Sequence, residues 1–110
     1  MRVDFYQLTR DPVEQVVPLL ARKTLQAGER MLVVSTDGEQ RGAIADALWK
    51  DGPAHFLANG EATKPHAARQ PILLSDACVA PNEARFLLLA DGVWREEANG
   101  FARTFLLFGP

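Results

Sequence analysis

The sequence predicts an α/β domain of three layers, with a mostly parallel β-sheet and helices on its faces. Apolar segments of strand length alternate with segments of helical period along the 110 residues. The segment "RMLVVST" is an uninterrupted apolar run, as expected of a strand that is covered on both faces. The strand, helix, strand order in the first third of the chain implies a right-handed crossover to a parallel neighbour.

The first strand is expected over residues 2–8, which are rich in β-branched, aromatic and aliphatic side chains. A helix should open near Pro12, because proline fits the first helical position. Asp11 before it can cap the free N–H groups, and Glu14 can reach back to the cap.

The first helix has one apolar stripe, and Gly28 supplies a left-handed stop. The residues of the stripe are Val13, Val16, Val17, Leu20, Thr24 and Ala27. Pro18 lies inside this pattern and lacks the N–H that would bond to the carbonyl of Glu14, so a bend or a local break is expected there.

After the second strand, "RMLVVST", Thr36 or Asp37 can cap a second helix that extends through Lys50. Its inner face is formed by Ile44, Ala45 and Leu48. Trp49 falls at the edge of that stripe.

Residues 51–70 show no sustained period, and Gly52-Pro53 is expected to break the chain at their start. Connections of this length are usually functional or disordered. "PILLSD" and "RFLLLAD" are expected to be the third and fourth strands, joined by the loop "ACVAPNEA", and "ARTFLLFGP" the fifth.

The length corresponds to a single domain over residues 1–110. A domain of this class normally ends with a helix after its last strand. The sequence stops at Pro110, so we expect either a short member of its class or a chain that lacks a C-terminal helix.

Composition excludes several classes of function. The net charge is −2 and the 12 Lys and Arg residues are scattered, which argues against a protein that binds the phosphate backbone of nucleic acid directly. The single cysteine, Cys78, cannot form an internal disulfide, so the cytoplasm is the expected compartment. No apolar run is long enough for a signal peptide or a membrane span, and no membrane role is expected.

No cofactor is expected. Ligands of open α/β sheets bind beyond the carboxyl ends of the strands, but the first such turn, "LTRDPVE", contains no glycine. Neither G-x-G-x-x-G nor G-x-x-x-x-G-K-[ST] occurs anywhere in the chain. The expected fold is therefore Rossmann-like without the nucleotide-binding loop.

Three aspartates keep an enzymatic alternative open. Asp37, Asp76 and Asp91 fall at or just after the ends of expected strands, where carboxylates can hold Mg²⁺ or act as nucleophiles. Aspartates also cap helices and begin turns at such positions, and no partner lysine or threonine motif accompanies these three.

Other reactive residues form no catalytic or metal-binding motif. His55, His66 and Cys78 are too far apart for the close pairs that metal sites use. Cys78 lies among small apolar residues, which favours a buried, inert thiol. Ser35 and Ser75 lack a G-x-S-x-G elbow, so no hydrolase triad is predicted.

Several segments together resemble a known family. They are "DFYQL", the helix-to-strand unit "PVEQVVPLLARKTLQAGERMLV", "IADALW", the pair Phe56-Leu57 before a glycine, "QPILL" and "FLLLADG". In this combination, which covers nearly all of the chain, the sequence resembles the chi subunit of bacterial DNA polymerase III holoenzyme. The chain departs from the family at Ala58-Asn59, where members commonly have Pro-His.

The resemblance implies a non-enzymatic α/β subunit of the clamp-loader complex. Such a subunit pairs with the psi subunit, or with a substitute partner where psi is absent, and grips the acidic C-terminal tail of single-stranded DNA-binding protein, so its contact with nucleic acid is mostly indirect. The family's tail-binding residues lie mainly in a C-terminal segment with no counterpart after Pro110, so no tail-binding residue is assigned here.

The resemblance also implies a partner-binding surface at Trp49, Phe56 and Leu57, because the family's helix-end Trp and following loop Phe help to receive psi. An aromatic anchor beside a turn offers a large apolar contact, as interface hot spots do. Two structural alternatives remain, in which Trp49 caps the core and Phe56 pins the loop to it. The sequence thus leaves two functions open: an interaction module of the replisome, or a small Mg²⁺-dependent enzyme whose aspartates would converge in a pocket.

Overall fold

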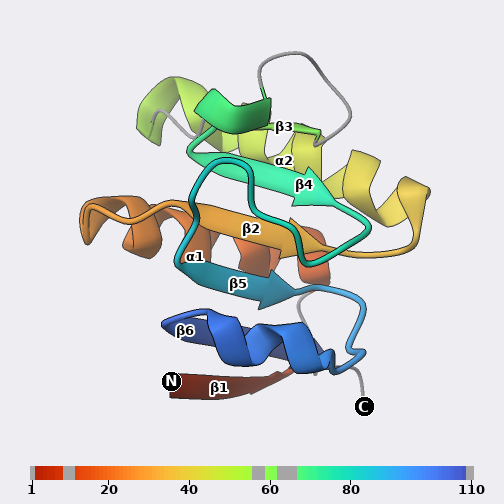
Figure 1. Ribbon diagram of the computed structural model, residues 1–110. Helices are drawn as coiled ribbons and strands as arrows, with labels where there is room; N and C mark the ends of the chain where they lie inside the picture. The colour runs from red at the N-terminus through yellow and green to blue at the C-terminus, as the bar shows by residue number, and fades with distance from the viewer. Residues whose placement is uncertain (1, 9–11, 56–58, 62–66, 109–110) are drawn as a thin grey trace.

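The computed structural model describes residues 2–8, 12–55, 59–61 and 67–108, and it confirms the α/β fold class. Six strands form one sheet in the order β1-β6-β5-β2-β4-β3, and all of its pairs are parallel (Figure 1). The elements in chain order are β1 (Arg2–Gln7), α1 (Val13–Gln26), β2 (Met31–Val34), α2 (Gly38–His55), β3 (Asn59–Glu61), η1 (Ala67–Arg69), β4 (Ile72–Ser75), β5 (Phe86–Leu89), η2 (Glu96–Gly100) and β6 (Arg103–Phe108).

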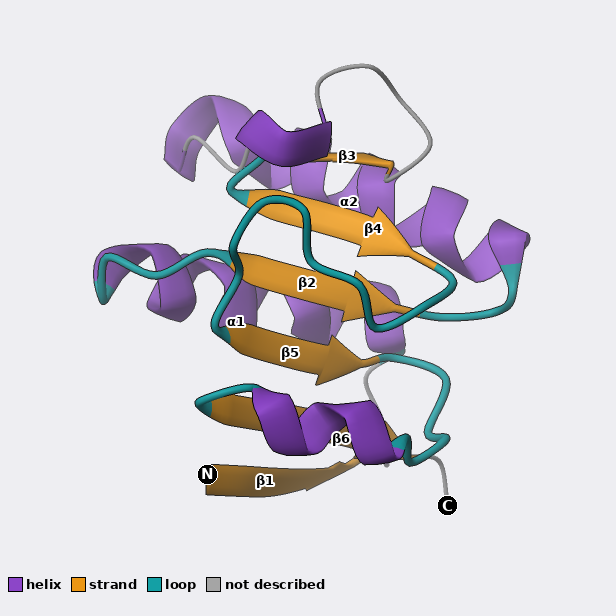
Figure 2. Cartoon of the chain, viewed as in Figure 1, coloured by secondary structure: helices purple, strands orange, loops and turns teal. Residues whose placement is uncertain are grey.

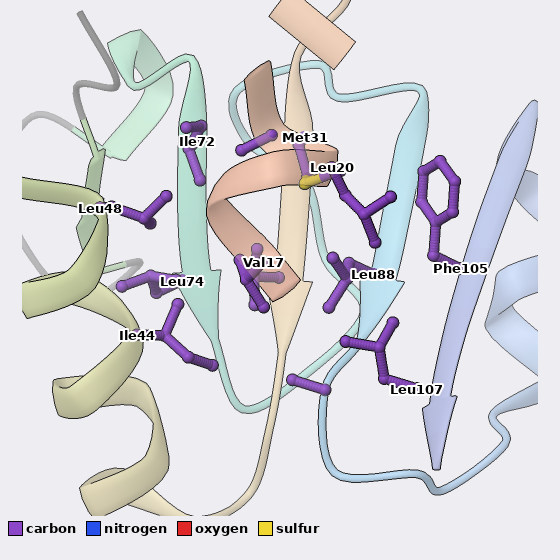
Figure 3. Close-up of a cluster of buried hydrophobic side chains, with 13 residues drawn as sticks. Val17, Leu20, Met31, Ile44, Leu48, Ile72, Leu74, Leu88, Phe105 and Leu107 are labelled. Atoms are coloured by element: carbon purple, nitrogen blue, oxygen red, sulfur yellow. The ribbon is translucent and has the colours of Figure 1, made fainter. Parts of the chain in front are cut away.

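Both α-helices cover the same face of the sheet (Figure 1). Because side chains alternate along a strand, every second residue of the sheet meets the helices. The resulting core, drawn in Figure 3, is built of Val17, Leu20, Ala21, Met31, Val33, Ile44, Leu48, Ile72, Leu74, Leu88, Ala90, Phe105 and Leu107.

The opposite face is covered by η1, η2 and the segment 76–85, which lies across the sheet in Figure 2. A second cluster forms there from Leu32, Val34, Ala67, Leu73, Ala84, Leu87, Leu89 and Ala98. The buried Asn82 anchors this layer, since its amide donates to the carbonyl of Gln70 at 2.9 Å and its carbonyl oxygen accepts from the N–H of Ala84. The three layers are thus present, but the third contains 3-10 helices in place of α-helices.

The first helix begins at Val13, one residue after the expected start, and ends as predicted. Gly28 has φ +78°, and its N–H donates to the carbonyl of Leu25 while that of Glu29 donates to Thr24. Of the bend or local break expected at Pro18, the break is absent: α1 runs through Pro18, which has no N–H to donate to the carbonyl of Glu14. Asp11, the expected cap, lies outside the described residues.

The second helix begins as predicted and ends later. Asp37 caps it, with Oδ1 accepting from the N–H groups of Glu39 at 2.9 Å and Gln40 at 3.3 Å. The expected break at Gly52-Pro53 is wrong, since α2 continues to His55. Proline disfavours helical backbone at the preceding residue, and part of the clash is with that residue's Cβ, which Gly52 lacks.

One strand was not predicted. β3, Asn59–Glu61, lies within the segment expected to be irregular, and it pairs with β4 at the sheet edge. Its three residues carry no apolar pattern, so only the pairing of the backbone with β4 defines it as a strand.

Candidate functional site

Trp49 lies on the surface of α2 and is 57% exposed. The helix directs Ile44 and Leu48 into the core, where both are fully buried. Each residue advances the helix by about 100°, so the residue after Leu48 leaves the buried face. Trp49 belongs to neither buried cluster.

The same geometry places Trp49 on the flank of α2 that faces away from α1. Ala47 and Lys50 line a groove of about 310 Å³ together with residues of α1. Ala47 and Trp49 project about 160° apart around the helix axis, since they are two residues apart. The indole ring is therefore not part of the groove between the helices.

The other two residues of the expected partner surface, Phe56 and Leu57, lie outside the described residues, as does His66. They directly follow the last residue of α2, His55. Of the expected surface, the structure therefore places Trp49 alone.

The groove between α1 and α2 was not anticipated from the sequence. It is lined by Glu14, Gln15, Pro18, Leu19, Arg22, Ala47 and Lys50. Leu19 is 51% exposed at its rim. In the sequence Leu19 falls between the positions of the apolar stripe, which is the signal that an apolar side chain faces solvent.

At the carboxyl edge of the sheet, the Asp91 carboxylate accepts hydrogen bonds from other groups of the protein. Its Oδ2 accepts from the N–H of Thr36 at 3.1 Å and its Oδ1 from the N–H of Val93 at 3.2 Å, while Arg95 binds both oxygens. Burial alone would raise the pKa of the Asp91 carboxyl, but these hydrogen bonds outweigh it and hold the pKa below its usual value.

Asp37 and Asp76, the other two candidate aspartates, do not join Asp91 in a metal-binding group. Asp37 caps α2, and Asp76 is exposed after β4. Within residues 2–8, 12–55, 59–61 and 67–108, no three carboxylate, histidine or cysteine side chains gather closely enough to hold a metal ion.

Two side chains that the sequence did not single out fill the same edge of the sheet. Gln40 accepts a hydrogen bond from the Ser35 hydroxyl and donates to the carbonyl of Ala90 at 3.3 Å. Arg41 donates to the carbonyl of Ser35 at 2.6 Å and lies 3.4 Å from the Glu61 carboxylate. These contacts connect β2, α2, β3 and the end of β5.

The contacts of Cys78, Ser35 and Ser75 are typical of residues with a structural role. Burial raises the pKa of the Cys78 thiol, and the side chain packs against the second cluster. The Ser75 hydroxyl accepts from the N–H of Ala77 at 3.1 Å, and the Ser35 hydroxyl from that of Asp37. Both serines are buried.

Among the residues that the structure describes, five large apolar side chains besides Trp49 are exposed. They are Phe5, Leu19, Val79, Val93 and Trp94. Neither of the two described α-helices has the length and apolarity that crossing a bilayer requires.

Comparison with known proteins points to one family. The family model described as DNA polymerase III chi subunit, HolC, matches residues 1–110 of the chain. No curated protein matches the chain closely enough to count as a relative.

Proposed function

Because the chain belongs to the family of DNA polymerase III chi subunits, we propose that it acts as a non-catalytic accessory subunit that receives the psi subunit on the surface around Trp49. In this role it joins the clamp loader to single-stranded DNA-binding protein in the cytoplasm, and its contact with DNA is mostly indirect. The family match supports a role in DNA replication as part of DNA polymerase III.

The exposure of Trp49 is the observation that carries the proposal. A tryptophan that is 57% exposed on a rigid helix can bury a large apolar area in a complex without losing much conformational freedom. The helix itself is fixed, because Ile44 and Leu48 on its inner face are completely buried. The anchor is therefore held in position before a partner arrives.

The polar contacts at the carboxyl edge of the sheet favour binding over catalysis. A general base or a metal ligand there would need a carboxylate free to meet a substrate. Asp91 instead has Arg95 on both oxygens, and Asp37 accepts two N–H groups of α2. These bonds support a structural role for both side chains.

The test is calorimetric titration of the psi subunit into the full chain and into the variant Trp49→Ala. We expect Trp49→Ala to weaken psi binding by roughly 2 kcal/mol, about thirtyfold, as for a central hot spot. Its free energy of unfolding should change by about 1 kcal/mol or less, because the ring is mostly exposed.

Trp94→Ala provides a matched control, since Trp94 is 42% exposed and lies in the turn after β5. Psi should bind this variant as it binds the unmodified chain. Equal weakening by both substitutions, or none by Trp49→Ala, would contradict the proposal.

A further inference from the structure

β1 forms one edge of the sheet, and its outer side has no neighbouring strand among the described residues (Figure 1). It is six residues long, whereas β3 at the opposite edge has three. An edge strand presents a row of N–H and C=O groups that can pair with another strand.

Hydrogen bonds at the two ends of β1 identify the groups that face outward. The N–H of Arg2 donates to the carbonyl of Ala102 at 3.1 Å, and that of Leu8 donates to Phe108 at 2.7 Å. Successive residues of a strand point their backbone groups to opposite sides. Even-numbered residues therefore face β6, and the outward set is Val3, Phe5 and Gln7.

The middle residue of this outward set is also an exposed aromatic. Phe5 is 67% exposed, on the face of the sheet that is opposite α1 and α2. The turn containing Val93 and Trp94, which are 53% and 42% exposed, follows Gly92. A Cβ on Gly92 would lie 3.5 Å from Cα of Phe108, so this turn borders the carboxyl end of β6, the strand beside β1.

We propose that β1 pairs with β1 of a second copy of this chain, in antiparallel orientation, with the two Phe5 residues opposite each other. In this register Val3 of each copy faces Gln7 of the other. All three outward-facing residues then form hydrogen-bonded pairs, which gives about six hydrogen bonds between the copies.

The side chains of β1 favour this register over the two registers that are shifted by two residues. A shift of two residues in one direction places the two Asp4 carboxylates opposite each other, and a shift in the other direction leaves Val3 without a partner in the strand. In the proposed register the Phe5 Cα atoms lie about 5.5 Å apart, close enough for their rings to stack on one face.

The charges of β1 do not oppose pairing with a second copy of the chain. The only ionised side chains of β1 are Arg2 and Asp4, of opposite sign, so two copies of the strand carry no net charge to repel each other. Strand pairing with one aromatic contact is a small interface. We therefore expect a dissociation constant of roughly 10–100 µM, in the range of transient dimers.

Sedimentation equilibrium of the full chain from about 1 µM to about 500 µM tests the proposal, because this range brackets the expected dissociation constant. Val3→Pro removes an N–H that faces away from β6, so it blocks the dimer without removing a hydrogen bond of the sheet. Phe5→Lys places two charges at the centre of the interface, and Val79→Lys makes the same change at a side chain of equal exposure on another surface.

We expect Val3→Pro and Phe5→Lys to weaken dimerisation at least tenfold, and Val79→Lys to leave it unchanged. Amide NMR of the unmodified chain gives a readout without substitutions: with rising concentration the N–H groups of Val3, Phe5 and Gln7 should shift and exchange more slowly, while those of Asp4 and Tyr6 should not. A chain that stays monomeric at about 500 µM, or a dimer that tolerates both β1 variants, would overturn the proposal.

Discussion

Asp91 and Arg95 form a two-pronged ion pair at the carboxyl edge of the sheet, with Nη2 2.8 Å from Oδ2 and Nη1 3.0 Å from Oδ1. Both side chains are largely buried, at 13% and 14% exposure. The same carboxylate binds the N–H of Thr36, two residues after the end of β2. Through this hydrogen bond Asp91 connects the turn after β5 to the segment that follows β2, the strand beside β5.

Asp91→Ala should destabilise the fold by about 2–4 kcal/mol, because it leaves Arg95 and two backbone N–H groups without their acceptor. Urea unfolding measures the change. Asp76→Ala is the control, since this exposed aspartate also follows a strand, and its effect should stay within about 0.5 kcal/mol. Similar losses from the two variants would contradict the role assigned to the pair.

Stability should fall in acid partly through Asp91. The pKa of this carboxyl is lower in the folded chain than its ordinary value of 3.8, so the unfolded chain binds a proton first. The stabilisation is present above that ordinary value and is lost as the pH falls through the folded pKa. Urea midpoints between about pH 6 and pH 3 should drop less steeply for Asp91→Asn than for the unmodified chain. Parallel curves would show that other carboxyls carry the dependence.

Two glycine substitutions should act in opposite directions. Gly28→Ala should cost about 1 kcal/mol, because φ is +78° at this residue. Gly42→Ala, inside α2, should stabilise by about 0.5–1 kcal/mol, since alanine favours helix and its Cβ would meet no atom within 4 Å. Thermal melting of both variants gives the comparison, and a loss of stability at Gly42 would be inconsistent with it.

Phe56 is predicted to anchor a partner and not the fold. Phe56→Ala should then cost about 1 kcal/mol of stability or less, whereas a fully buried phenylalanine would cost roughly 3–5 kcal/mol. Psi binding should weaken by roughly 2 kcal/mol or more. Urea unfolding and calorimetric titration provide the two values. A large loss of stability at unchanged affinity would make Phe56 a core residue.

Local chemistry was enough to predict much of the fold. The apolar runs of β2, β4 and β5, the cap at Asp37 and the stop at Gly28 each depend on a few consecutive residues, and all are present in the structure. The family resemblance, confirmed by the match over residues 1–110, likewise depended on short segments read in order.

Two kinds of prediction failed, one about helix ends and one about a strand. Proline and glycine favour a break when considered alone, yet α1 and α2 pass through Pro18 and Gly52-Pro53 in the assembled domain. β3 is a strand because it pairs with β4, and no pattern within Asn59–Glu61 predicts a strand.

Some features of the candidate surfaces could be predicted from the sequence, and others depended on the packing of distant segments. An aromatic at the edge of a helical stripe marks Trp49 from the sequence alone, because helical period determines which side chains leave the core. The bond between the N–H of Thr36 and Asp91 and the edge position of Phe5 were decided by strand order, and the groove by the packing of α1 beside α2. Strand order is a property of non-local packing, so the period and composition of a segment do not encode which segment lies beside it.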